Sequence, residues 1–150
     1  PAYIHPEDRF MLTDPIKDFG PAGIGKLAQL AFGALFSEPR QVIELDSDGD
    51  RLGIGGMVVT VDHTPGHTRG SVVFRVTAET SDVVFTGDTL FRQSVGRTDL
   101  PGGSGRDLLG SIVTKLLVLD DDTVVLPGHG QKTTIGLERR TNPFLEGLTL

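Results

Sequence analysis

The sequence predicts an α/β domain, and three features of the chain lead to this expectation. First, β-branched apolar runs at 57–61, 83–85 and 123–126 are typical of strands. Second, the stretches 24–36 and 106–117 carry apolar residues at the spacing of a helix face. Third, each of the three runs is followed by a glycine-containing turn with a histidine or an aspartate.

The remaining predicted elements are shorter. Residues 1–15 combine extended and loop signals, because their prolines and an Asp-Pro pair disfavour a long helix. Short strands are expected at 42–45 and 71–76, and a last helix at 134–140 that ends before an Asn-Pro pair. The strongly apolar helix at 24–36 is expected either to be buried or to form a wall of a substrate cleft.

Composition narrows the classes of function. The chain has 150 residues, of which 37% are hydrophobic and 23% charged, values typical of one globular domain. Its net charge of −6 argues against a general surface for nucleic acid or anionic membrane. It has no cysteine, which excludes disulfides and thiolate metal ligands. No apolar run approaches the roughly 18 residues of a membrane span, so a cytoplasmic location is expected.

Three polar side chains follow the predicted strands. They are His67 in TPGHT, Asp88 in TGDT and His129 in LPGHG, and a glycine beside each lets the backbone turn sharply. Two imidazoles and one carboxylate are nitrogen and oxygen donors suited to zinc, iron or manganese. We therefore expect a metal site at the strand ends.

Other motifs fit known sites poorly. His63 lies four residues before His67, but Pro65 and Gly66 break any helix between them, so His63 is expected to support the ligands or the fold. The acidic stretch 46–50 lacks the glycine and glutamate positions of a calcium-binding EF-hand loop and is expected to be a turn. Glycine-rich segments lack the lysine and hydroxyl residues of a phosphate-binding loop.

The ordered set of motifs resembles a known family. TPGHTRGS at 64–71, FTGDTLF at 85–91 and PGHG at 127–130 resemble the later motifs of the metallo-β-lactamase fold. SVGRTDLPGG at 94–103 and ERRTNPF at 138–144 resemble the glyoxalase II-like enzymes, the hydroxyacylglutathione hydrolases. Nearly the whole chain is covered by this resemblance.

The resemblance implies an αβ/βα sandwich with a two-metal site, with zinc as the expected metal and iron or manganese as alternatives. In it, His67 would bind the first metal, Asp88 would bridge both, and His129 would bind the second. The implied reaction is hydrolysis of a thioester such as S-lactoylglutathione, with a metal-bridged hydroxide as the nucleophile. Arg97 and Asp99 would brace the loop behind the ligands or form a plain ion pair.

Two departures from the family pattern shape the expectation for this chain. The family's first motif, H-x-H-x-D-H, is absent, which implies that it lies upstream. Residues 1–150 are therefore expected to be the C-terminal portion of a single metallo-β-lactamase-like domain, inactive alone and weak in metal binding. An uncovered apolar sheet face or strand edge would then favour self-association or pairing with the missing N-terminal half. The basic helical segment that recognises glutathione in the family is also absent after Leu150, so a smaller or looser thioester or ester substrate stays open.

Two further functions remain as alternatives. One is other chemistry on the same site, such as mononuclear-iron persulfide dioxygenation or lactone hydrolysis, because this fold hosts many reactions. The other is a non-catalytic binding module built on a decayed site.

Overall fold

The computed structural model describes residues 1–14, 37–45, 48–77 and 81–148, so the helix predicted at 24–36 lies outside the described residues. The chain divides into two compact units, Pro1–Asp46 and Ser47–Leu150. Each unit is treated by itself below. Among the described residues, no helix is long and apolar enough to cross a membrane.

The first unit contains two short strands and a turn of 3-10 helix. β1 (Ala2–Ile4) pairs in parallel with β2 (Val42–Glu44), which confirms the strand expected at 42–45. The 3-10 helix η1 (Pro6–Leu12) is short, as the prolines predict, and the His5 ring accepts a hydrogen bond from the backbone N–H of Glu7 at 3.3 Å.

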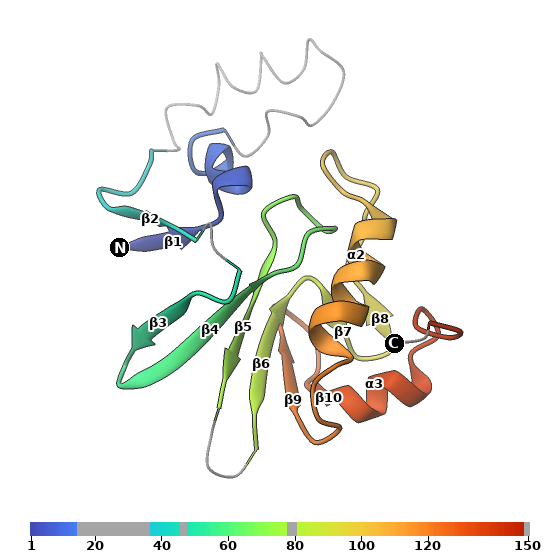
Figure 1. Cartoon of the computed structure of the whole chain (residues 1–150). Coiled ribbons are helices and arrows are strands. Elements are labelled where there is room, and N and C mark those ends of the chain that lie inside the picture. Colours follow the sequence, from blue (N-terminus) through green and yellow to red (C-terminus); the bar gives the residue numbers. More distant parts are fainter. Residues whose placement is uncertain (15–36, 46–47, 78–80, 149–150) are drawn as a thin grey trace. The chain divides into compact units, whose positions relative to one another are not determined.

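The second unit is built on one six-stranded sheet in the order β10-β9-β6-β5-β4-β3 (Figure 1). Neighbouring strands are antiparallel except for β6 and β9, which run in parallel. A separate two-stranded hairpin, β7 with β8, follows β6 in the chain. The strands are β3 (Arg51–Ile54), β4 (Met57–His63), β5 (Val72–Val76), β6 (Val83–Gly87), β7 (Leu90–Phe91), β8 (Ser94–Val95), β9 (Val124–Pro127) and β10 (Thr133–Thr134).

The two regular helices of this unit begin at side-chain caps. The Ser104 hydroxyl accepts from the backbone N–H of Asp107 at the start of α2 (Gly105–Ser111), and Thr134 caps α3 (Ile135–Thr141) in the same way. The predicted helix at 106–117 is confirmed, but from Ile112 to Leu116 it continues as a wider π-helix. There the Thr114 hydroxyl donates to the Gly110 carbonyl at 2.8 Å and so competes for the acceptor that an α-helix would use.

The core lies between the sheet and these helices. Figure 1 shows α2 and α3 on the same side of the sheet. Side chains of both layers form one cluster with at most 5% exposure, which contains Val73, Val84, Leu90, Leu108, Ile112, Leu116, Leu117, Val125, Ile135 and Leu145. This mixed sheet with flanking helices confirms the predicted α/β class.

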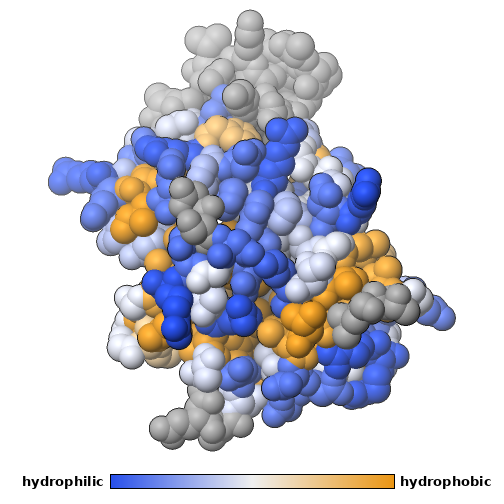
Figure 2. Space-filling model, viewed as in Figure 1, coloured by the Kyte–Doolittle hydropathy of each residue, from blue (hydrophilic) through white to orange (hydrophobic). Residues whose placement is uncertain are grey.

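Some apolar side chains remain at the surface. Val58 is 52% exposed and Phe85 is 44% exposed, both on strands of the sheet. Figure 2 shows apolar patches between the polar and charged groups that cover most of the visible face.

Candidate metal centre

The sheet topology brings the three predicted donors to one edge. β4 and β6 each run antiparallel to β5, so they run parallel to each other, and β9 is parallel to β6. The carboxyl ends of these three strands therefore lie at the same edge of the sheet. His67 follows β4, Asp88 follows β6 directly, and His129 follows β9 after one residue.

The Asp88 carboxylate lies between the two imidazoles. Its Oδ2 is 3.5 Å from Nε2 of His67, and its Oδ1 is 3.7 Å from Nε2 of His129. Ligands of one tetrahedral zinc ion at ordinary bond lengths stand about 3.4 Å apart. Both pairs therefore have the spacing of two groups that share an ion, with one carboxylate oxygen on each side.

The orientation of His67 supports a cation at this point. Its Nδ1 lies 2.9 Å from the backbone carbonyl of Arg97, which can only accept a hydrogen bond. In the neutral ring, Nδ1–H is therefore the donor and Nε2 presents a lone pair to the Asp88 carboxylate. Two acceptors that face each other need a proton or a cation between them, and a backbone carbonyl behind a metal-binding imidazole is a common arrangement. The donor set thus fits divalent metal.

His129 is held more loosely than His67. Its side chain is 73% exposed, compared with 20% for that of His67. The Phe91 ring packs against it with the two ring centroids 4.5 Å apart and the planes tilted by 31°. Aromatic packing therefore positions this imidazole.

Glycines allow the backbone to approach the donors closely. A Cβ on Gly128 would lie 2.8 Å from Oδ1 of Asp88, and one on Gly96 would overlap the Asp88 carbonyl. The backbone N–H of Gly128 also donates to the Gly87 carbonyl at 2.8 Å and ties the His129 loop to the end of β6. The close approach of the backbone to Asp88 thus requires residues without a side chain at 96 and 128.

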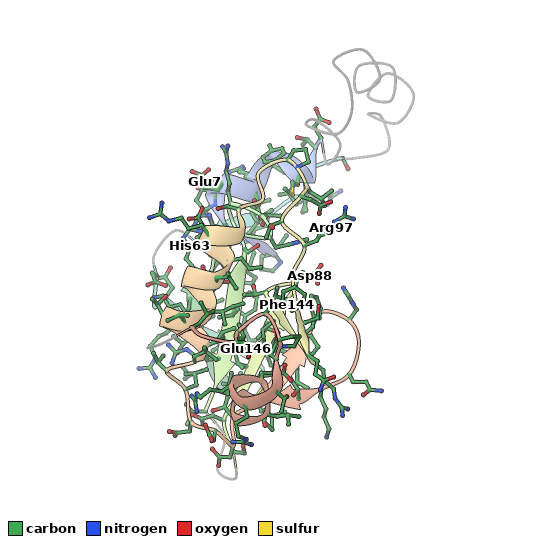
Figure 3. All side chains as sticks on the ribbon, turned by 90° about the vertical axis from the view of Figure 1, so that its right-hand side faces the viewer. Glu7, His63, Asp88, Arg97, Phe144 and Glu146 are labelled. Carbon is green, nitrogen blue, oxygen red and sulfur yellow. The ribbon has the colours of Figure 1, made fainter. Side chains whose placement is uncertain are left out.

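The donors lie on the wall of a cavity of about 370 Å³, whose lining also contains Phe91, Ser94, Val95, Gly96, Arg97, Gly130 and Gln131. A neighbouring cavity of about 460 Å³ shares the segment Val95, Gly96 and Arg97 and is otherwise lined by Thr98, Asp99, Gly105, Leu108, Leu109 and Phe144. Figure 3 shows Asp88, Arg97 and Phe144 on the same side of the molecule. The segment 95–97 therefore borders both cavities.

Arg97 and Asp99 form the ion pair that the sequence left as one of two options. Arg97 donates to both Asp99 oxygens at 2.8 Å, and this guanidinium holds the pKa of the Asp99 carboxyl at about 2. Both side chains are more than 60% exposed. Arg97 contacts His67 through its backbone carbonyl, while its guanidinium is paired with Asp99.

His63 has a supporting position. Its Nε2 lies 2.8 Å from the Arg69 carbonyl, and its backbone N–H donates to Asp48 at 2.9 Å. It is absent from the lining of the donor cavity, and Figure 3 labels it well apart from Asp88. Asp48, in the predicted acidic turn, also pairs with Lys115, which lowers the pKa of its carboxyl.

Within the described residues, no three His, Cys, Asp or Glu side chains surround a single ion position. Each of two ions would receive two ligands from this chain, with Asp88 shared between them. Sequence reasoning missed the polar side chains that support the site from the interior, above all Glu138 and Asn142, which are 0% and 3% exposed. Their one signal was the ERRTNPF segment, whose function the pattern did not reveal.

Comparisons with known proteins place the chain in a known superfamily. Residues 1–129 match the Metallo-beta-lactamase superfamily. An uncharacterized protein of Mycobacterium tuberculosis is 68% identical over 99% of this chain and 66% of its own length. The hydroxyacylglutathione hydrolase GloC of Haemophilus influenzae is 46% identical over 67% of this chain and 46% of its own. Probable metallo-hydrolase YqgX of Bacillus subtilis is 39% identical over the full chain and 66% of its own. The chain thus spans about two thirds or less of these relatives.

Two solved structures share the fold. The crystal structure of the B3 metallo-beta-lactamase BLEG-1 has a TM-score of 0.78 and 41% identity, over 98% of this chain and 66% of that one. The structure of TTHA1623 in a di-iron-bound form has a TM-score of 0.71 and 42% identity, over 97% and 65%. The predicted metallo-β-lactamase fold is therefore confirmed.

Proposed function

Because this chain belongs to the metallo-beta-lactamase superfamily, we propose that it supplies part of a two-metal site that hydrolyses thioesters such as S-lactoylglutathione. The observation that carries this proposal is the Asp88 carboxylate, with one oxygen toward each of two imidazole Nε2 atoms. The similarity to GloC, a hydroxyacylglutathione hydrolase, supports the thioester class.

Each of the three donors would have its own role in binding the two ions. His67 would hold one ion, His129 the other, and Asp88 would contact both and reduce their mutual repulsion. Divalent ions bound there would supply an activated water and would polarise the substrate carbonyl. Zinc suits this donor set. Iron is the second candidate, since the similar structure of TTHA1623 is described as di-iron-bound.

The cavity lining supports a thioester over a substrate with a poorer leaving group. Among the described lining residues, the titratable side chains are His67, Asp88, Arg97 and His129. If three of these hold metal, the remaining guanidinium is a poor proton donor because it stays charged at all ordinary pH. A thiol has a pKa of about 8.5, so it departs as the thiolate with little need of protonation. An amide nitrogen would need a proton.

β-Lactam hydrolysis is the second candidate function. The 41% identity to the B3 metallo-beta-lactamase BLEG-1 favours it. It would require protonation of a nitrogen leaving group, which the described lining residues do not provide.

The test joins this chain to the third of the M. tuberculosis relative that it leaves unmatched, in that relative's order, and loads the fusion with zinc. We expect two zinc ions per chain, hydrolysis of S-lactoylglutathione, and no turnover of a chromogenic cephalosporin. The chain without the added segment should be inactive. A fusion that holds two ions and cleaves the cephalosporin but not the thioester would overturn the proposed substrate class. A fusion that holds no metal would overturn the site.

A further inference from the structure

A buried carboxylate lies behind the candidate site. Glu138 on α3 is 0% exposed and lines neither of the two cavities described above. Its oxygens accept three hydrogen bonds: from the Thr133 hydroxyl at 2.6 Å, from the backbone N–H of Gln93 at 2.7 Å, and from the Asn142 amide at 2.9 Å. Burial of a carboxylate is unfavourable unless such donors surround it. The three donors therefore account for its stable burial.

Two of these donors belong to the segments that flank His129. Gln93 lies in the turn between β7 and β8, and β7 ends with Phe91, the residue whose ring packs against His129. Thr133 begins β10, which returns along β9 immediately after the loop that carries His129. One carboxylate thus joins the segment that supplies the aromatic contact to the segment that supplies the imidazole.

The turn at Gln93 requires such a constraint. Gln93 has φ of 55°, which a residue other than glycine rarely adopts, and it alone does so among the described non-glycine residues. Its backbone N–H points to Glu138. Asn142 adds a second link, because its amide donates both to Glu138 and to the Ser94 carbonyl at 3.1 Å. The hairpin is therefore held from the interior at Gln93, in its turn, and at Ser94, the first residue of β8.

We propose that Glu138 is a positioning residue for His129. Its carboxylate fixes the β7–β8 turn and the start of β10, so that Phe91 holds the exposed His129 ring with Nε2 toward Asp88. The metal-binding role of His129 rests on the proposed function, but the orientation of its ring does not and is measured without metal.

The test compares Glu138→Gln with Asp62→Asn. The control also converts a buried carboxylate to an amide, since Asp62 is 4% exposed and pairs with Arg75 outside both cavities. In the metal-free chain, the His129 ring protons should be shifted upfield by the Phe91 ring in NMR spectra, with the signal assigned by its loss in His129→Ala. Glu138→Gln should abolish this shift, and Asp62→Asn should retain it.

Two further measurements separate positioning from general loss of structure. Glycine adopts a positive φ freely, so adding Gln93→Gly to Glu138→Gln should restore part of the upfield shift. A Zn²⁺ titration is followed on both histidine signals. In Glu138→Gln, the Zn²⁺ concentration at the midpoint of the His129 change should rise by about 10- to 100-fold, and the midpoint for His67 should change little.

The positioning role of Glu138 can be tested even if the Glu138→Gln variant does not fold. If Glu138→Gln does not fold, Thr133→Val removes one of the three donors with little change in shape and should reduce the upfield shift. An unchanged His129 signal in the folded variant, or an equal change in Asp62→Asn, would overturn the positioning role. If Zn²⁺ moves neither histidine signal in the fusion that carries the added segment, the proposed function fails while the ring shift in the metal-free chain still tests the role of Glu138.

Discussion

Replacement of Gly66 by alanine tests whether the loop that carries His67 is fixed by its contact with helix α2. Gly66 has φ of 144°, which strains any residue with a side chain. An added Cβ would lie 2.5 Å from Cβ of Leu108 and closer still to that residue's Cα and N, whereas real contacts of this kind essentially never fall below 3.0 Å. The helix or the loop would therefore have to move by at least about half an ångström.

Hydrogen bonds make that movement costly. The Gly66 carbonyl accepts from the backbone N–H of Ser104 at 2.8 Å, and the Pro65 carbonyl accepts from the Ser111 hydroxyl at 2.8 Å. The strained backbone costs about 1–3 kcal/mol, and overpacking costs about 1–3 kcal/mol more. We expect Gly66→Ala to lower the free energy of unfolding by about 2–6 kcal/mol and to weaken Zn²⁺ binding at His67.

The assay is urea denaturation followed by circular dichroism, with Gly110→Ala as the matched control. Gly110 lies inside α2 with nothing within 4 Å of an added Cβ, so alanine there should stabilise the chain by about 0.5–1 kcal/mol. A loss below about 1 kcal/mol for Gly66→Ala, with the His67 ring signals unchanged, would refute the view that this close approach positions the ligand loop.

The remaining predictions concern the charges and the apolar surface of the second unit. Arg97→Gln should raise the pKa of Asp99 from about 2 toward its ordinary value in a carboxyl NMR titration. Because the native pKa is depressed, the contribution of this pair to stability is complete above about pH 4 and disappears as pH falls through about 2. If the free energies of unfolding of the variant and the native chain differ by the same amount at every pH, this expectation is contradicted. Asp88→Ala should abolish the changes that Zn²⁺ causes in the ring signals of both histidines. His129→Ala should leave the change at His67. If both variants lose the His67 change equally, the idea of a shared carboxylate is contradicted. Phe85→Ser should lower self-association in light scattering, since Phe85 is 44% exposed; unchanged association would exclude this side chain from the contact.

The strands with strong β-branched composition were predictable from sequence. The runs that became β4, β6 and β9 alternate or cluster valines, and hydrophobic burial dominates their placement. β3, with the sequence RLGI, was missed because arginine and glycine weaken the strand pattern and pairing with β4 supplies the order instead. The π-helical turn was also missed, since apolar spacing over 112–116 differs little between an α-helix and a wider turn.

The proximity of the three candidate donors was predictable because each is a chemically distinctive residue in the turn that follows a strand. The groups that hold these donors in place were not predictable from sequence. Glu138 looks like an ordinary charged position on a short helix, and only the three-dimensional arrangement shows it buried among donors from residues 5 and 45 positions away. The Arg97 carbonyl is a backbone group, so no side-chain pattern could reveal its bond to His67.

His67 and His129 are held by different kinds of contact, and this difference affects which chemistry we expect of the site. His67 is oriented by a hydrogen bond to a backbone carbonyl, which substitutions of side chains leave in place. The His129 ring packs instead against Phe91, on the hairpin that Glu138 holds. By our proposal, changes at Gln93 or Glu138 would alter the orientation of His129 without replacing a ligand. Because Asp88 serves both positions, loss of order at His129 would convert a two-ion arrangement into a one-ion arrangement. By our proposal, that conversion would separate the two-metal hydrolase from the mononuclear-iron alternative, and residues outside the ligand set would control it.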